Sequence, residues 1–321
     1  MIQRGAFLIF SLLILLVINF LLPRALPGNP VTRFVDNGVF TPQIQQQILA
    51  SFGLTQPLYV QFWLYLRGTF TGNYGVSFLY YPTPVAVILE QRLPWTIFLV
   101  GVSTIISAVI GIFLGLQSGW KGNSKTDSSI VFSSMALRSV PSFWLGLILL
   151  ILFAVTWRIF PTAGYFSSSF DVSSGGGFLS FVESVVSHSV LPVATLTAYL
   201  VGGNVLIMRA STLAVLNEDF VTTLYAEGYP DRKILYGHVM KNAFLPMLTN
   251  IGIQMGFIAS GAVLVETVFS YPGMGLLIYQ AVLARDYPSL QGAFFVLTIT
   301  VLIAVFLADL LNSFLDPRIR R

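Results

Sequence analysis

The sequence is poor in ionisable residues and contains no cysteine. Only 9% of its 321 residues are charged, whereas 55% are hydrophobic, and the mean hydropathy is +0.80. This balance excludes a soluble globular domain, in which about a quarter of the residues are normally charged. Without cysteine the chain has no disulfide framework and no thiol chemistry, so its redox compartment cannot be read from this residue type.

The motifs that bind nucleotides, metals or acyl substrates are also missing. No Gly-x-x-x-x-Gly-Lys-Ser/Thr loop occurs, and the run Gly175 to Gly177 lacks the lysine that such a loop needs. The two histidines, His188 and His238, are not at metal-ligand spacing, and no serine nucleophile elbow is present. The sequence therefore predicts no catalytic site, no metal site and no cofactor bound by this chain.

What the sequence does contain is a series of apolar runs long enough to cross a bilayer. They do not alternate with polar residues, which argues against a β-barrel and predicts an all-α polytopic membrane protein. A cleavable signal is the alternative for the first run, but its apolar core is long and no small-x-small site follows, so we expect an uncleaved helix. The six predicted spans are residues 5–22, 94–117, 130–160, 188–209, 245–269 and 290–314.

These spans divide the chain into four parts. Residues 1–22 form an N-terminal transmembrane helix, and residues 23–93, rich in Pro, Gly and aromatic residues, form a folded extracytoplasmic segment with short helices. Residues 94–314 form a core of five transmembrane helices that includes a polar loop at 211–246, and residues 315–321 form a tail.

The distribution of Lys and Arg orients the chain. Basic residues are concentrated beside the ends of the predicted spans on one side, which the positive-inside rule identifies as cytoplasmic. Both termini and the 211–246 loop are therefore predicted to be cytoplasmic, and the net charge of +4 needs no nucleic-acid partner to explain it. The basic residues on the predicted inner side are Arg4, Lys121, Lys125, Arg209, Arg232, Lys233, Lys241, Arg318, Arg320 and Arg321.

The longest strongly polar stretch between two spans is residues 216–249. Asn217 can serve as the N-cap of a first short helix, and Gly228 has the place of its left-handed C′ residue. Pro230 and Asp231 then begin a second helix, with an inward face formed by Ile234, Leu235, His238 and Val239. The pattern predicts two short amphipathic helices hinged at a glycine, although an ordinary loop held at the lipid surface by its basic residues is the simpler alternative.

The run AEGYPDRKILYGHVMKNAFLPMLT resembles the EAA loop of the oligopeptide/dipeptide permeases, which belong to the binding-protein-dependent ABC importers. The alanine-rich start of that loop is degraded here to Thr222, Thr223 and Leu224. Further phrases similar to the family, such as LRSVPSFWLG, FPTAGY and VETVFSYPGMG, follow in the family's order. The resemblance implies that an ATPase subunit docks on Ala226, Glu227, Gly228, Asp231, Arg232, His238, Asn242 and Pro246.

The same resemblance implies the other subunits of the transporter. It predicts a type I ABC importer permease in a prokaryotic inner or plasma membrane, paired with a homologous second permease, two cytoplasmic ATPase subunits that bind the ATP, and an extracytoplasmic solute-binding protein. Peptides are the expected substrate, with oligosaccharides and nickel chelates as alternatives. An ion-coupled secondary transporter is the alternative from another class, but the inverted repeat and acidic midplane sites that it needs are not found.

Three further residues are candidates for the translocation path or for helix packing: Arg138, Pro141 and Asp309. Arg138 is expected near the cytoplasmic end of the third span. An arginine inside a span usually faces a partner or a water-filled cavity, but one near a helix end can also extend to the headgroups.

Overall fold

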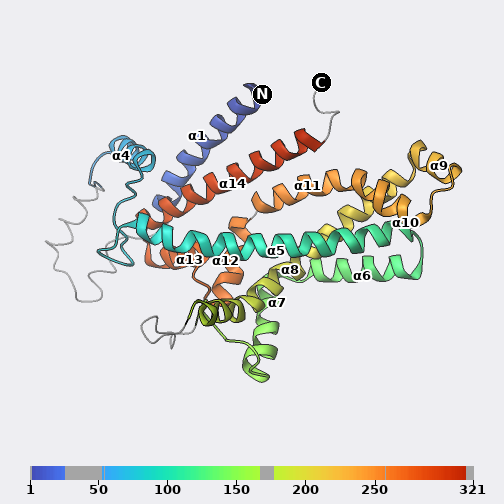
Figure 1. The fold of residues 1–321 in the computed structure, drawn as a ribbon. Coiled ribbons are helices and arrows are strands. Elements are labelled where there is room, and N and C mark those ends of the chain that lie inside the picture. The colour runs from blue at the N-terminus through green and yellow to red at the C-terminus, as the bar shows by residue number, and fades with distance from the viewer. Residues whose placement is uncertain (1, 26–52, 54, 167–176, 257, 316–321) are drawn as a thin grey trace. The chain divides into compact units, whose positions relative to one another are not determined.

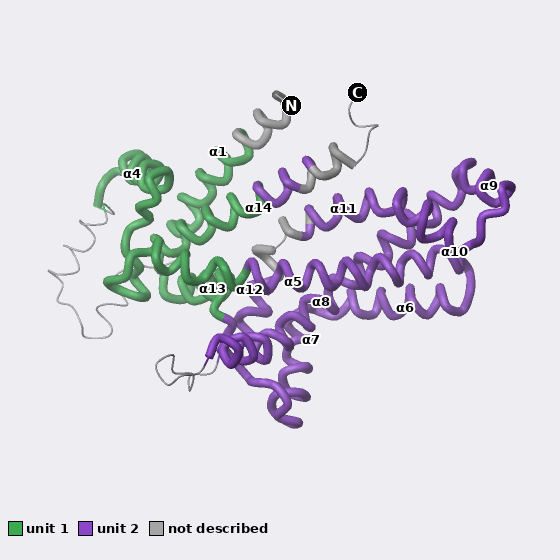
Figure 2. Tube along the Cα trace, viewed as in Figure 1, with its two compact units in different colours: residues 1–96, 272–302 green, residues 97–271, 303–321 purple. Residues whose placement is uncertain are grey.

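The computed structural model describes residues 2–25, 53, 55–166, 177–256 and 258–315, and within these the side chains of 2–9, 253, 255, 256, 258–261, 308, 309 and 311–315 are not described. The chain forms two compact units (Figure 2), unit 1 from residues 1–96 and 272–302 and unit 2 from residues 97–271 and 303–321. The described part is helical (Figure 1), and its one β-interaction is an isolated antiparallel bridge between Val76 and Pro84.

Helices occupy all six segments predicted to span the membrane. Three of them are long and apolar enough by themselves, α5 (Val85–Trp120), α8 (Phe178–Leu216) and the stretch Tyr287–Leu307 of α14 (Tyr287–Leu315). A bent pair, α6 (Lys125–Ser139) with α7 (Ser142–Leu149) and the π-helix η1 (Leu150–Thr156), makes a fourth. The first and fifth predicted spans correspond to α1 (Ile2–Ala25) and to α11 (Met240–Gly256) with α12 (Ile258–Val268). The count of six spans stays a prediction.

The predicted span at 130–160 is not one straight helix, because α6 and α7 are bent by 95°. The break lies at Val140 and Pro141. Proline has no N–H to donate and pushes the preceding residue toward extended backbone, and Val140 has φ −82° and ψ 126°. The chain therefore turns sharply here.

In unit 1, the helix α4 (Leu58–Thr71) packs against α1. The rings of Phe20 and Phe62 meet edge to face at 5.1 Å, and the buried Asn19 amide donates to the Tyr65 hydroxyl at 3.0 Å and to the Gln291 carbonyl at 2.9 Å. These contacts confirm that part of the segment after the first span is folded.

The buried carboxylate of Asp286 joins two distant stretches of unit 1. It accepts hydrogen bonds from the Ser77 hydroxyl at 2.5 Å, the Leu79 N–H at 3.1 Å and the Ser289 hydroxyl at 2.7 Å. The preceding helix, α13 (Met274–Ala284), is short and is not amphipathic. Most of its residues are buried, and its exposed ones include Leu283 and Val282.

In unit 2, α5 and α8 approach each other along a stripe of glycines. Gly111, Gly115 and Gly119 follow each other at intervals of four, and Cβ atoms built on them would collide with Asn204, Met208 and Thr212 of α8, respectively. Small residues at this spacing let two helix backbones come close, which is a common means of helix association in membranes. The hydropathy pattern alone does not reveal this contact.

Replacing Gly115 by alanine is expected to lower the thermal stability of the protein. The added methyl would lie 2.6 Å from Met208 Cβ, and forcing a methyl into a packed interface costs roughly 1–3 kcal/mol. Gly101 on the same helix is the control, since a Cβ there would meet none of the described heavy atoms within 4 Å. Gly101→Ala should be neutral or stabilising. Thermal unfolding followed by tryptophan fluorescence compares the two, and equal midpoints would contradict the close approach of α5 and α8.

Candidate functional site

The polar segment after α8 begins with a cap that differs from the predicted one. Asn217 was expected to start the next helix, but it ends α8, where its side-chain amide donates to the Leu213 carbonyl at 3.0 Å. The N-cap of α9 (Asp219–Ala226) is Glu218, and its side chain makes no capping hydrogen bond. The amide of Asn217 satisfies a carbonyl that the end of α8 would otherwise leave open.

Gly228 closes α9 as predicted. Its φ is +80°, its N–H donates to the Tyr225 carbonyl at 3.0 Å, and the Tyr229 N–H donates to the Leu224 carbonyl at 3.1 Å. These two bonds form a Schellman motif, which needs a left-handed residue at this position and therefore favours glycine. The turn presents Ala226, Glu227 and Gly228 to solvent, since all three are exposed.

The second predicted helix does not end before the membrane. It begins after Pro230 as α10 (Asp231–Lys233), continues as the π-helix η3 (Ile234–Val239) and runs on into α11. The expected pair of short helices is thus one short helix and the start of a long one. The π-helix has a physical reason. Ile234 and Val239 are five residues apart, and one wider turn keeps both on the buried face.

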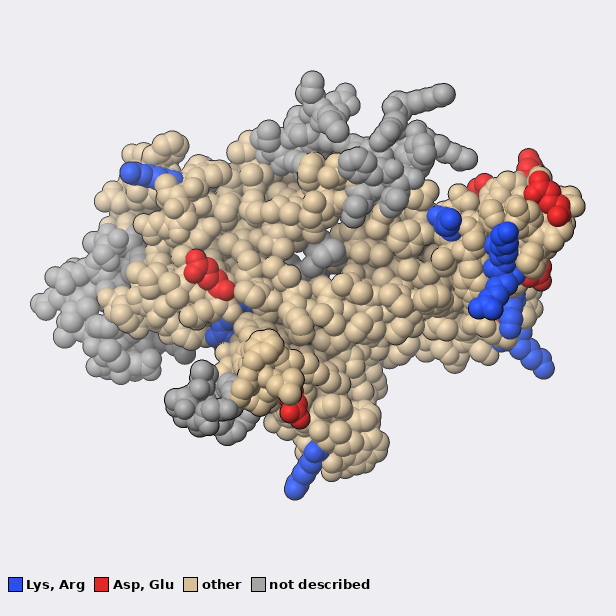
Figure 3. Space-filling view, viewed as in Figure 1, with Lys and Arg blue, Asp and Glu red and all other residues tan. Residues whose placement is uncertain are grey.

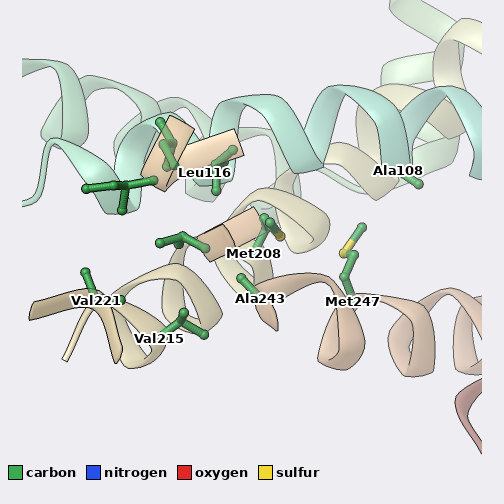
Figure 4. Close-up of a cluster of buried hydrophobic side chains, with 10 residues drawn as sticks. Ala108, Leu116, Met208, Val215, Val221, Ala243 and Met247 are labelled. Carbon is green, nitrogen blue, oxygen red and sulfur yellow. The ribbon is translucent and has the colours of Figure 1, made fainter. Parts of the chain in front are cut away.

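The inner face of this corner is apolar, and it packs on α5 and α8. Ile234, Leu235 and Val239 are buried as predicted, whereas His238 is only half-buried. Figure 4 shows Val221, Ala243 and Met247 facing Leu116 of α5 and Met208 of α8. The corner is therefore anchored to two membrane helices. The buried members of this cluster are Ala108, Leu116, Met208, Val215, Val221, Ile234, Leu235, Val239, Ala243 and Met247.

The outer face of the corner is charged. Charged side chains gather at the end of unit 2 formed by α9 and α10 (Figure 3). Asp231, Arg232, Asn242 and Pro246 are all exposed. Burial of part of the Tyr225 ring, and then the negative charge of Asp231, raise the pKa of the Tyr225 hydroxyl.

Tyr229 connects the two halves of the corner, a role that sequence reasoning missed. The Lys233 ammonium lies 4.5 Å from the centre of the Tyr229 ring, and the His238 ring meets the same ring edge to face at 5.8 Å. The Asn242 amide in turn donates to the His238 carbonyl at 3.0 Å. His238 and Asn242 are thereby brought together. The His238 ring packs against Tyr229 and is only partly exposed to solvent.

Beside this corner lies an ion pair that the sequence does not reveal. Arg209 of α8 donates twice to Asp127 of α6, at 2.6 and 2.7 Å, and the Ser118 hydroxyl of α5 donates to the same carboxylate at 2.5 Å. The side chain of Asp127 is 4% exposed and that of Arg209 27%. The pair therefore ties together three helices at the level where the corner packs.

The polar side chain of Asn204 marks a second buried site. Its carbonyl oxygen accepts from the Asn250 amide at 2.9 Å and from the Gln254 amide at 2.6 Å, and its own amide donates to the Ser107 hydroxyl at 3.1 Å. The network joins α5, α8 and α11. Intervals of 46, 50 and 97 residues separate these partners, so no local sequence pattern could have indicated it.

The remaining candidates have separate places. Arg138 lies in the last turn of α6, about 20 Å along the helix from Lys125 at about 1.5 Å per residue, and its place near the cytoplasmic end of the span stays a prediction. Pro141 begins α7 at the bend. The side chain of Asp309 lies outside the described residues, and its role stays a prediction.

The amino-acid sequence matches known protein families and relatives over nearly its full length. Residues 107–321 match the family described as binding-protein-dependent transport system inner membrane component, and residues 1–100 match the N-terminal family of the same systems. The oligopeptide transport system permease protein AppB of Bacillus subtilis is 32% identical, over 99% of this chain and 98% of its own. The probable peptide ABC transporter permease protein y4tP of Sinorhizobium fredii is 35% identical, over 94% of this chain and 92% of its own.

A solved structure shares the fold. A chain of the MetNI methionine ABC transporter in an inward-facing conformation superposes with a TM-score of 0.58 at 14% identity, covering 71% of this chain and 96% of that chain. Apolar helices and this shared fold define an integral membrane protein. The chain belongs to the binding-protein-dependent transport system inner membrane component family, so the predicted resemblance is confirmed. This membership favours a permease over an ion-coupled carrier.

Removing Arg209 and removing Asp127 are expected to lower the thermal stability of the protein by different amounts. Arg209→Gln leaves the buried Asp127 carboxylate without its counter-ion, which costs roughly 3–5 kcal/mol, whereas Asp127→Asn leaves an arginine that still reaches solvent. We expect the arginine variant to lose more thermal stability, and the double variant to lose less than the sum of both. Additive effects in this double-mutant cycle would show that the two side chains do not interact.

Proposed function

We propose that this chain is the transmembrane permease subunit of an ATP-driven importer, and that the corner formed by α9, the Gly228 turn and α10 receives a cytoplasmic ATPase subunit. The observation that carries the proposal is the two-sided construction of this corner. Its outer face is exposed and charged, while its inner face is fixed to α5 and α8 by the buried cluster. Family membership adds the expectation of ABC partners.

The continuous helix from Asp231 to Gly256 gives this corner a mechanical role. A displacement applied at α10 is carried along η3 into α11, because no loop lies between them to absorb the movement. Packed interfaces switch between arrangements rather than deform gradually, so α11 and the helices it contacts would change position together. Closure of an ATPase dimer could in this way drive the switch between inward- and outward-facing states.

The complete transporter would contain four kinds of component. A homologous second permease pairs with this chain, two ATPase subunits bind and hydrolyse ATP, and an extracytoplasmic binding protein delivers the solute. The charge bias supports a cytoplasmic position for both termini and for the corner, with the segment that contains α4 outside. This chain itself performs no hydrolysis.

Peptides are the substrate that we propose. The relatives AppB and y4tP are named for oligopeptide and peptide transport, and both matches cover more than nine tenths of both chains. Oligosaccharides and nickel chelates are the competing cargoes.

The transport reaction can be tested with the purified components in proteoliposomes. We expect accumulation of a labelled dipeptide that requires the ATPase subunits, ATP and the binding protein together, and no accumulation of a labelled oligosaccharide or of nickel chelate. Accumulation driven by a proton or sodium gradient in the absence of ATP would contradict the proposal and support a secondary transporter.

Gly228→Val is expected to assemble with the second permease but to lose transport. A Cβ at Gly228 would meet no described heavy atom of this chain within 4 Å, so the substitution adds bulk only on the docking face, beyond a backbone strain of about 2 kcal/mol. Uptake and co-purification of the ATPase subunits measure the effect.

Gly72 provides a matched control for this strain. It ends α4 with φ +74°, and a Cβ there would likewise meet none of the described atoms within 4 Å. Gly72→Val therefore carries the same conformational cost in unit 1, far along the chain from the corner, and should keep both uptake and ATPase binding. Wild-type uptake in Gly228→Val would rule out docking at this turn.

A further inference from the structure

Arg138 occupies an unusual place for a charged residue. It packs on α8, where a Cβ at Gly202 would lie 3.2 Å from Arg138 Cβ and a Cβ at Gly203 would lie 3.3 Å from its Nη1 atom. These glycines belong to the stretch of α8 from Ser189 to Met208, which contains no charged residue. Such a stretch is about 30 Å long, the thickness of the hydrocarbon core, so Arg138 lies at membrane depth.

The guanidinium of Arg138 is exposed, and it has no hydrogen bond or ion pair with any described residue. Arg209, which contacts the first turn of α6, has the opposite arrangement, since its charge is neutralised by Asp127 at 2.6 Å. A charged side chain without a partner at this depth costs several kcal/mol in lipid, and such residues therefore face water-filled cavities and mark transport pathways. The two glycines of α8 leave the room in which the guanidinium lies.

The neighbouring polar groups are neutral. Asn204, next to Gly203, is held in the network with Asn250 and Gln254, and the Gln254 Oε1 atom is buried without a hydrogen-bond partner among the described residues. These amides hydrogen-bond to one another, while the Arg138 charge has no carboxylate partner in the described contacts. This charge is suited to an anionic group, because a planar guanidinium binds a carboxylate with two hydrogen bonds.

We propose that Arg138 binds the carboxylate of the peptide substrate as it passes through the membrane. The inference rests on the proposed function. Every linear peptide with a free C-terminus carries such a group, whereas a neutral oligosaccharide carries none, so an unpaired arginine at this depth would favour the first cargo. Arg138 is then a specificity-determining residue of the translocation path, and the bend at Val140 and Pro141 ends α6 directly after it.

The test uses the complete transporter in proteoliposomes and one dipeptide in two forms, with a free C-terminal acid or a C-terminal amide. Arg138→Gln should reduce uptake of the acid about tenfold, as expected for a lost charge-assisted hydrogen bond, and lower the ratio of acid to amide uptake relative to wild type. Arg138→Lys should keep most of the acid uptake and most of the acid-to-amide uptake ratio. The same binding protein supplies all variants, so its own preference cancels in this comparison. Arg158→Gln, which removes an exposed arginine from the loop after η1, should change neither quantity.

If the wild type imports only the acid form, the uptake ratio cannot be compared, and ATP hydrolysis by the complete transporter is measured beside acid uptake. Arg138→Gln must then lose acid uptake while keeping ATP hydrolysis stimulated by the binding protein, and the lysine variant must recover uptake. An equal loss for both peptide forms, a loss that follows the anionic lipid content of the vesicles, or unchanged uptake would overturn the inference. Failure of the wild type to import either peptide would instead refute the proposed function.

Discussion

The arrangement of unit 2 depends on the ion pair between Asp127 and Arg209. A carboxylate that is 4% exposed is stable only if its charge is matched and its oxygens accept hydrogen bonds, and here Arg209, Ser118 and the Asn123 N–H provide both. The pair fixes α6 to α8 while the glycine stripe fixes α5 to α8. The three helices consequently form one support, and the corner with α9, α10 and η3 packs its apolar face against that support.

This support explains how the short segment with α9 and α10 can have one face buried against membrane helices and the other exposed to solvent. Its buried face needs van der Waals contact with Leu116 and Met208, while its outer face remains exposed for a partner. The Schellman turn at Gly228 separates the two helical parts and fixes the angle between them. A corner held in this way can transmit force, because a rigid attachment moves its neighbours where a mobile loop would only reorient itself.

Two other buried polar side chains follow the same rule. Asp286 gathers hydroxyl and N–H donors from two stretches of unit 1, and Asn204 is held by amides and a hydroxyl from other helices of unit 2. Each is satisfied by neighbours, as a low-dielectric interior requires. Arg138 is exposed and has no hydrogen bond or ion pair with a described residue, and in the proposal above the substrate carboxylate is its partner.

The sequence by itself determined the features that depend on nearby residues. Apolar runs predicted the helices, Gly228 predicted the end of α9, and the buried positions Ile234, Leu235 and Val239 followed from helical spacing. Local reasoning misplaced Asn217, separated α10 from α11 and overlooked the break at Val140, although Pro141 was visible. Only the tertiary structure decided which groups meet across 46 to 97 residues, such as Asn204 with its amide and hydroxyl partners and Arg209 with Asp127. The physical reason is that the partner of a buried polar group is chosen by helix packing, and helix packing depends on contacts that no local period in the sequence records.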